Sequence, residues 1–218
     1  MSSIGVLLDT NVRLSTYTHI WAYTRRSERR GNKFVTWIEE TPAPRILRNM
    51  TLERSNSIYE SLKRIAEMSK QGLVTLYESD ETLAEFLNFR PAGFGLAKFD
   101  IFSGVTIRHA RAPVARGFRI DASYTPNGAR KAWHTFLEQI SHPRFLKLLE
   151  RTGGDHAADL YHVWEAEHNG IDAFVTLDRK FVNAVTKPKP LETPVKVCTP
   201  SQFTLWIPTR TPATRAET

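Results

Sequence analysis

Four short apolar runs, each next to a helical pattern, constrain the fold more than any other feature of the sequence. They lie at 4–8, 73–77, 173–177 and 195–198 and are rich in branched or aromatic residues. Between them, apolar residues recur at helical spacing, and Pro or Gly residues punctuate the chain. A chain that alternates buried strands with helices forms a parallel sheet covered on both faces. We therefore predict an α/β fold, a three-layer α/β/α sandwich with a mainly parallel central sheet.

The intervening segments give the expected helices. Helical spacing predicts a helix from about 54 to 70, one or two helices between 129 and 149 that break at Pro143, and a terminal helix opened by residues 199–201. The first run should be followed directly by a longer helix. Its apolar positions would be Leu14, Tyr17, Ile20 and Trp21.

Length and composition indicate one folded domain. The chain has 218 residues, of which 41% are hydrophobic and 24% charged, within the range of globular proteins. We predict a single domain over 1–207 with an inserted basic segment near 90–128, followed by a flexible tail over 208–218 that lacks apolar periodicity. The lone cysteine, Cys198, excludes an internal disulfide and a cysteine-based zinc site and suits a reducing cytoplasm.

No stretch predicts an association with a membrane. Apolar runs stay well below the ~18 residues of a membrane span, and the N-terminal run is short and has no basic lead of the kind found in signal peptides. We therefore expect a cytoplasmic protein without a membrane partner.

Acidic residues recur where strands are expected to end. Asp9 follows the first run and Asp178 follows the third. Ligands of open α/β sheets bind outside the carboxyl ends of the strands, so these two side chains should share one rim. Glu85, just past the first turn of the helix after the second run, should stand at the same rim. Asp155 and Asp159 precede the third run and are four residues apart, so on a helix they would share one face.

Clustered carboxylates repel one another unless a cation joins them, so the rim predicts a metal site. We assign Asp9, Glu85, Asp159 and Asp178 as metal ligands and catalytic residues, with Asp155 as a further possible ligand. An all-oxygen shell suits Mg²⁺ or Mn²⁺, and such an ion supports hydrolysis of phosphodiesters. In simpler interpretations Asp9 only caps a helix, and Asp155 and Asp159 belong to a solvated acidic face.

Three polar residues beside these acids would orient the carboxylates or a water molecule. They are Thr10, Asn11 and Thr176.

Positive charge points to a polyanionic partner. The 30 Lys and Arg against 23 Asp and Glu give a net charge of +7 and a pI near 9.7. Between 24 and 33 the chain is basic and flanked by aromatic residues, as a groove for single-stranded nucleic acid would require, although a solvated charged face is the simpler alternative. The predicted RNA-binding residues are Arg25, Arg26, Arg29, Arg30, Lys33, Arg108 and Arg111. The last two lie in a segment that fits either an Arg-lined substrate loop or a hairpin added to the core.

Several of these motifs, in their order and spacing, resemble those of PIN-domain nucleases. The run from Val6 to Val12 resembles the family's opening motif, and Thr82 to Phe86 looks like the helix that carries its second acid. The spacing from Asp159 to Asp178 is similar to the block with the third and fourth acids, and 195–203 looks like the closing strand and helix. Trp164 and Glu165 depart from the family, which usually has small residues there, so this helix should pack differently.

The resemblance implies a three-layer α/β fold, dependence on Mg²⁺ or Mn²⁺ and cleavage of RNA. Proteins of this kind often act as the VapC-type toxin of a toxin–antitoxin pair, which implies an antitoxin protein as a partner, and they often form homodimers. The function predicted is a metal-dependent endoribonuclease.

Two other functions remain open at this point. One is a catalytically inactive PIN-like module that binds nucleic acid or protein. The other is a phosphatase-like hydrolase that uses Asp9 as a covalent nucleophile, which Asn11 disfavours because that chemistry usually places a second acid two residues on.

Overall fold

A five-stranded parallel sheet forms the centre of the protein. The computed structural model describes residues 3–30, 33–47, 50–82, 99–116, 126–152, 154–187 and 189–207. The sheet has the order β5-β4-β1-β6-β7, and every neighbouring pair of strands is parallel. Its strands are β1 (Ile4–Leu8), β4 (Val74–Glu78), β5 (Ile107–His109), β6 (Ala173–Val175) and β7 (Lys196–Cys198).

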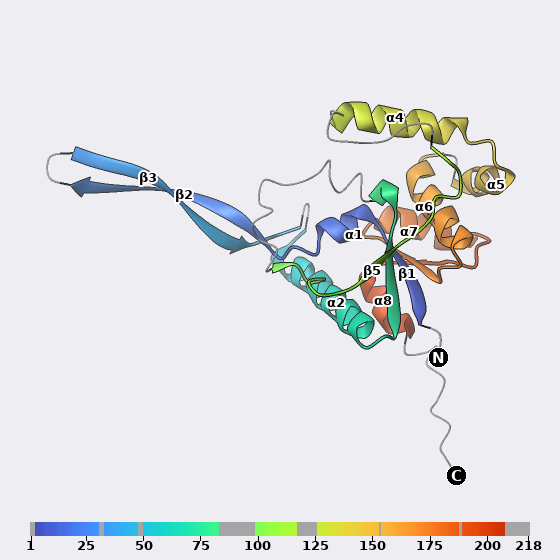
Figure 1. Cartoon of the computed structure of the whole chain (residues 1–218), viewed down its shortest axis with the longest axis horizontal. Helices are drawn as coiled ribbons and strands as arrows, with labels where there is room; N and C mark the ends of the chain where they lie inside the picture. The colour runs from blue at the N-terminus through green and yellow to red at the C-terminus, as the bar shows by residue number, and fades with distance from the viewer. Residues whose placement is uncertain are drawn as a thin grey trace, which may run out of the picture.

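Helices cover both faces of this sheet, which confirms the predicted three-layer α/β/α sandwich (Figure 1). The alternation of side chains along β1 shows the two layers, because Leu7 packs into one hydrophobic core while Val6 and Leu8 pack into the other. The core around Leu7 is completed by α4 (Pro126–Gln139), α5 (Pro143–Thr152), α6 (Ala157–His168) and α7 (Arg179–Thr186). The opposite core is completed by α2 (Leu52–Lys70) and α8 (Pro200–Trp206).

Local sequence signals begin several of these helices. The hydroxyl of Thr51 accepts a hydrogen bond from the backbone N–H of Arg54 at 3.2 Å at the start of α2. Thr199 and Gln202 form a reciprocal capping box at the start of α8, with Pro200 in the first turn. These caps leave little freedom in where the helices start, and both lie close to the predicted boundaries.

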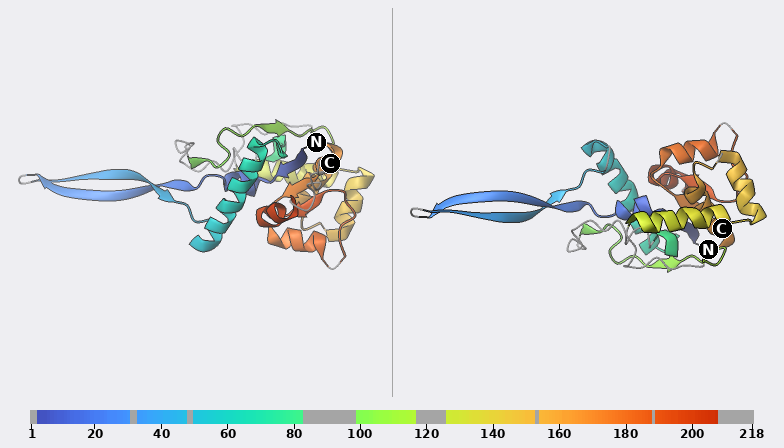
Figure 2. Two further views of the ribbon diagram at one scale, coloured as in Figure 1. Left: turned by 90° about the horizontal axis from the view of Figure 1, so that it is seen from below. Right: turned by 90° about the horizontal axis from the view of Figure 1, so that it is seen from above.

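A long two-stranded arm projects from the body. Its strands are β2 (His19–Arg30) and β3 (Lys33–Pro44), which pair antiparallel from His19 opposite Pro44 to Arg30 opposite Lys33. Figures 1 and 2 show the arm extending away from the sheet and its helices. The basic segment predicted to line a groove for single-stranded nucleic acid lies on this arm, and its described side chains are exposed.

The helix predicted through Tyr17, Ile20 and Trp21 is therefore wrong. The helix α1 (Thr10–Leu14) ends early, Tyr17 forms an isolated bridge with Asp100, and Ile20 and Trp21 lie in β2. The strand formers of β3 supply a pairing partner that the helical spacing of residues 14–21 does not reveal. Long-range strand pairing has overridden the local pattern.

The chain leaves the body for the arm and returns to it at one point. The backbone N–H of Arg45 donates to the carbonyl of Thr18 at 2.8 Å, and the hydroxyl of Tyr59 donates to the carbonyl of Arg45 at 2.7 Å. Thr18 is held in turn by Phe99, whose carbonyl accepts from the backbone N–H of Thr18 at 3.2 Å. The base of the arm is thus fixed to α2 and to the segment before β5.

Some sequence predictions fall on segments outside the description. Of the predicted insertion at 90–128, the structure describes 99–116, which contains β5 and extends the sheet beside β4, and 126–128 at the start of α4. Residues 83–98, among them Glu85, and 117–125 lie outside the described residues. The predicted tail at 208–218 also lies outside. Among the residues described, no helix combines the length and apolar character needed to cross a membrane.

Candidate metal centre

The carboxyl ends of β1 and β6 meet at one edge of the sheet. Leu8 is paired with Val175 at the end of the two strands, and the backbone N–H of Asp9 donates to the carbonyl of Val175 at 3.0 Å. Asp178 follows three residues after Val175 and caps α7. The two acids predicted at strand ends therefore stand at the same rim, as expected for neighbouring parallel strands.

A single hydroxyl connects this part of the rim. Thr176 Oγ1 donates to Asp9 Oδ2 at 2.5 Å and accepts from the backbone N–H of Asp178 at 3.0 Å and from Asn11 Nδ2 at 3.2 Å. Asn11 Oδ1 in turn accepts from the backbone N–H of Leu177 at 2.9 Å. A hydroxyl has one proton and two acceptor positions, so Thr176 is fully used in holding Asp9, Asn11 and Asp178 together.

Asp9 does more than begin a helix. It occupies the N-cap position of α1, but its side chain makes no capping hydrogen bond there, and it is buried. Its contact with Thr176 shows that the carboxylate is turned toward the rim instead. Thr10, predicted to orient a carboxylate, donates to the carbonyl of Thr82 at 3.4 Å.

Three side chains at this rim could hold a metal ion. One ligand atom from each of His156, Asp159 and Asp178 lies within 4.8 Å of the other two, and His156 Nδ1 is 3.6 Å from Asp159 Oδ2. Ligands at about 2.1 Å from a shared ion lie up to roughly 4.2 Å apart, so small rotations of the side chains would complete the coordination. All three are partly exposed and accessible to an ion.

The secondary structure positions each of these three residues. Asp178 Oδ1 accepts from the backbone N–H groups of Lys180 and Phe181 at 2.8 and 3.0 Å, which fixes the carboxylate at the start of α7. His156 is the N-cap residue of α6, with its ring centroid 5.3 Å from that of Phe181, and Asp159 is in the first turn of α6. The positive ends of both helix dipoles thus favour negative charge at this point.

The cluster differs in membership from the predicted site. Asp159 and Asp178 belong to it and His156 was not predicted, whereas Asp155 is exposed and is not a member. Asp9 is connected to Asp178 of the cluster through Thr176. The predicted second acid, Glu85, lies outside the described residues.

The residues predicted to bind RNA are spread over two regions. Arg25, Arg26, Arg29 and Lys33 lie exposed on the arm, where Arg26 Nε is 2.7 Å from Glu39 Oε2, and Arg30 belongs to β2 by its backbone. Arg108 lies in β5, and the backbone of Arg111 is held by Asn169. None of them belongs to the cluster of His156, Asp159 and Asp178.

A second polar centre is buried beside α6, and sequence reasoning missed it. Glu81 is 1% exposed and its Oε1 lies 3.0 Å from Arg116 Nε, while Glu165 Oε2 lies 3.2 Å from Nδ1 of the buried His162. Burial raises the pKa of Glu165 to about 7, and His162 partly opposes this shift. Glu165 is thus buried with His162 as its partner.

Trp164 packs against a neighbouring helix. Its ring stacks on Phe145 of α5, with centroids 5.6 Å apart, and lies against His142 at 4.8 Å. Trp164 thus joins α6 to α5, and the expected difference from PIN nucleases in the packing of this helix stays a prediction.

The raised pKa of Glu165 makes stability depend on pH. A carboxyl that binds its proton more tightly when folded lowers the free energy of unfolding as the pH rises from 4.5, its ordinary pKa, to about 7. We expect Glu165→Gln to remove this decrease, which amounts to about 3 kcal/mol for a shift of roughly 2.5 pKa units at 1.36 kcal/mol each. Urea denaturation of both proteins at pH 4.5 and pH 8 measures it. Equal pH dependence in the two proteins would contradict the assignment.

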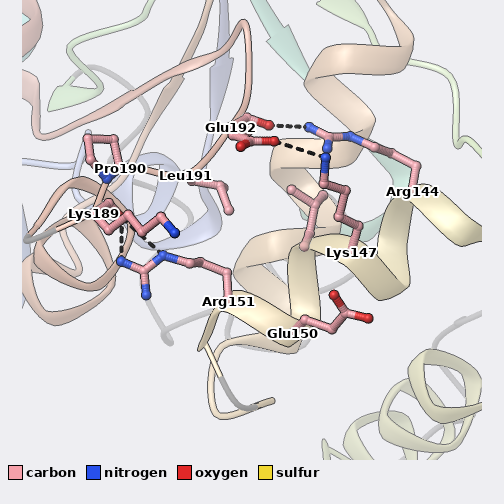
Figure 3. Close-up of a pocket in the computed structure, with 9 residues that line it drawn as sticks. Arg144, Lys147, Glu150, Arg151, Lys189, Pro190, Leu191 and Glu192 are labelled. Carbon is pink, nitrogen blue, oxygen red and sulfur yellow. Dashed lines mark hydrogen bonds and ion pairs between the residues drawn. The ribbon is translucent and has the colours of Figure 1, made fainter.

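A basic pocket is lined by residues outside both of these centres (Figure 3). It encloses about 450 Å³ between α5 and the loop at 189–192. Three of its cations have partners in the protein. Arg144 donates to the main-chain carbonyl of Glu192, Lys147 binds the carboxylate of Glu192, and Arg151 Nε donates to the carbonyl of Lys189 at 3.0 Å. These contacts fasten the loop to α5, so the pocket has a structural role.

Comparisons with known proteins identify no relative of this chain. No protein-family model matches the chain, and neither the curated proteins nor the solved structures searched include a significant match to it.

Proposed function

We propose that the protein is a divalent-metal-dependent endoribonuclease of the PIN type. The observation that carries this proposal is the convergence of His156, Asp159 and Asp178 at the carboxyl edge of a parallel sheet, with Asp9 tied to the same rim by Thr176. The charge of +7 adds an attraction for a polyanionic substrate. The spacing of the acids resembles that of PIN nucleases, and this resemblance supports RNA as the substrate.

The residues of the cluster have separable roles in this proposal. His156, Asp159 and Asp178 would hold the ion, which when bound stabilises charge on the phosphodiester oxygens and acidifies a bound water. The Asp9 carboxylate, oriented by Thr176, would accept the proton of the attacking water. The N-termini of α6 and α7 would add a favourable dipole field for the negative charge of the ligand carboxylates. Asn11 would hold the Thr176 hydroxyl in the orientation that Asp9 requires.

The ligand set favours Mn²⁺ over Mg²⁺. Carboxylates suit both ions, but Mg²⁺ is rarely bound by imidazole, whereas transition metals accept nitrogen and oxygen ligands together. Replacing His156 by alanine should therefore weaken Mn²⁺ binding more than Mg²⁺ binding. The biological role implied by the resemblance is that of a toxin whose partner is an antitoxin peptide.

The direct test is cleavage of a structured RNA by the full chain with Mn²⁺, with Mg²⁺ and with excess EDTA. We expect cleavage with either ion, faster with Mn²⁺, and none with EDTA. Thermal denaturation with and without Mn²⁺ reports metal binding independently of activity, because an ion that binds the folded state raises the melting temperature. RNA binding that weakens steeply with salt, together with no turnover under any condition, would instead establish the inactive binding module.

A further inference from the structure

The tip half of β3 is apolar and exposed. The sequence Lys33-Phe34-Val35-Thr36-Trp37-Ile38-Glu39, here called the β3 segment, carries no charge between its two ends. Phe34 is 76% exposed and Ile38 67%, and Val35 and Trp37 are also exposed. Elsewhere in the described chain, large exposed hydrophobic residues are isolated from one another in the sequence. A run of this kind on a projecting arm marks an interaction surface.

The arm alone does not satisfy its own backbone. Among the described residues β3 pairs only with β2, so its outer edge presents N–H and C=O groups along its whole length. Isolated two-stranded ribbons are marginally stable in water, and a third strand is what usually stabilises them. Open edges with uncharged, strand-forming side chains pair readily with another strand. The natural occupant of this edge is therefore a β-strand.

The β3 segment is complementary to itself in the antiparallel direction. If two copies pair about Thr36, then Lys33 faces Glu39 of the second copy, Phe34 faces its Ile38, and Val35 faces its Trp37. Each of these pairs joins residues on the same face of the ribbon, because residues an even number apart share a face. Opposite charges therefore meet at both ends, and apolar side chains meet between them.

We propose that two copies of this chain associate by edge-to-edge pairing of their β3 segments, antiparallel and centred on Thr36. The resulting ribbon has four strands, with β3 of each copy inside and β2 outside. Because the pairing is antiparallel and close to the tip, the two bodies lie at opposite ends and do not collide (Figures 1 and 2). This interface is independent of the metal centre and goes beyond the proposed nuclease function.

The distribution of charge supports this occupant. The arginines at 25, 26 and 29 lie on β2, and the described apolar residues of the tip half lie on β3. Within one arm Arg29 faces Phe34, Arg26 faces Trp37 and Arg25 faces Ile38. Pairing through β3 therefore keeps the arginines of the two copies on opposite outer edges, with both β3 strands between them, and brings no like charges together.

A single-cysteine experiment on the full chain tests the register. The native Cys198 is buried, so it should not form a cross-link. In the Thr36→Cys variant, the thiol at position 36 of one copy would face the thiol at position 36 of the second copy. Their Cβ atoms would be about 4.5–5.5 Å apart, close to disulfide geometry. The matched control is Ser27→Cys, because Ser27 lies beside Thr36 on β2, with the two hydroxyl oxygens 3.1 Å apart. Across the four strands its two copies would be three spacings apart, roughly 14 Å.

We expect mild oxidation to give a disulfide-linked dimer of Thr36→Cys and little of Ser27→Cys. Equal cross-linking of the two variants, or none of either, would overturn the proposal. Sedimentation of the unmodified protein over a range of concentrations should also show a monomer–dimer equilibrium. A protein that stays monomeric at high concentration, and dimerises only on added nucleic acid, would overturn it in favour of a nucleic-acid-binding arm.

Charge exchange supplies a second test that does not depend on oxidation. Lys33→Glu places two acidic pairs across the interface and should weaken the dimer about tenfold, since two attractive pairs become repulsive. Glu39→Lys should weaken it similarly, with an added effect from the loss of the Arg26 ion pair within its own arm. The double variant restores opposite charges across the interface and should regain the dimer affinity that Lys33→Glu loses. Failure to recover would overturn the register.

Discussion

Replacing Asp178 by asparagine should lower the rate of RNA cleavage by roughly 10²–10³-fold without unfolding the protein. Asparagine is as good an N-cap as aspartate, so α7 should still begin at the same residue, supported by the bonds that Asp178 now accepts from Lys180 and Phe181. What is lost is the negative charge beside His156 and Asp159. Initial rates with saturating Mn²⁺, compared with the thermal stability of the same preparation, separate the two effects.

Matched variants sharpen this expectation. Asp159→Asn should reduce cleavage to a similar degree, whereas Asp155→Asn, the same chemical change at an exposed acid outside the cluster, should leave the rate within about twofold. Thr176→Val removes the hydroxyl that orients Asp9 and should cost about 10–100-fold, the range typical of groups that orient ligands. A loss in Asp155→Asn equal to that in Asp159→Asn would refute the cluster as the active site.

Replacing Arg116 by methionine should destabilise the protein by about 3–5 kcal/mol, because it leaves the carboxylate of Glu81 buried without its cation. Methionine retains much of the apolar volume of arginine, so the loss of stability reports mainly the unpaired negative charge of the buried Glu81 carboxylate. The second contact of Arg116, to Asp80 at 3.2 Å, involves an exposed carboxylate and should contribute little. Urea denaturation at pH 7 measures the difference.

The corresponding rescue uses both partners. Adding Glu81→Gln to Arg116→Met removes the buried charge as well, so most of the lost stability should return. Glu81→Gln alone should be much less destabilising than Arg116→Met, because arginine can still reach Asp80 and water. If the two substitutions were simply additive, Glu81 and Arg116 would not be coupled and the ion pair would have no energetic role.

The layers of the fold could be predicted because their signals are local. Short apolar runs mark buried parallel strands, and capping residues such as Thr51 and Thr199 mark where helices begin. The arm could not be predicted in the same way. Residues 14–21 fit a helical spacing, and only their pairing partner, remote in the sequence at 33–44, makes part of this stretch a strand.

The candidate site was likewise predicted only in part. Asp9 and Asp178 could be placed at one rim because each follows a strand, and parallel strands end together. His156 was not predicted because the sequence analysis placed Asp155 on the same helix as Asp159, where the two acids would share one face. Gly154 has a φ of 89°, so the chain turns there, Asp155 lies outside α6 and His156 becomes its N-cap. The spacing of His156 three residues before Asp159 was the signal that could have revealed it.

The buried polar centre of Glu81, Arg116, Glu165 and His162 could not be predicted from the sequence. Glu81 and Glu165 resemble ordinary surface acids in the sequence, since acids are seldom buried without a partner. Their partners are His162, one turn away, and Arg116, which approaches from a different part of the chain. Only the tertiary structure brings Arg116 to Glu81, so burial of this acid could not be read from its neighbours.

The hydrogen bond between Arg45 and Thr18 has a consequence for how such a chain could arise and be modified. Because the two ends of the arm touch, the ribbon between them can be lengthened, shortened or excised without moving α1 or α2. A short turn joining Thr18 to Arg45 would close the body over the gap. The arm is in this sense a separable unit, whose length and sequence can change while the sheet and its helices stay as they are.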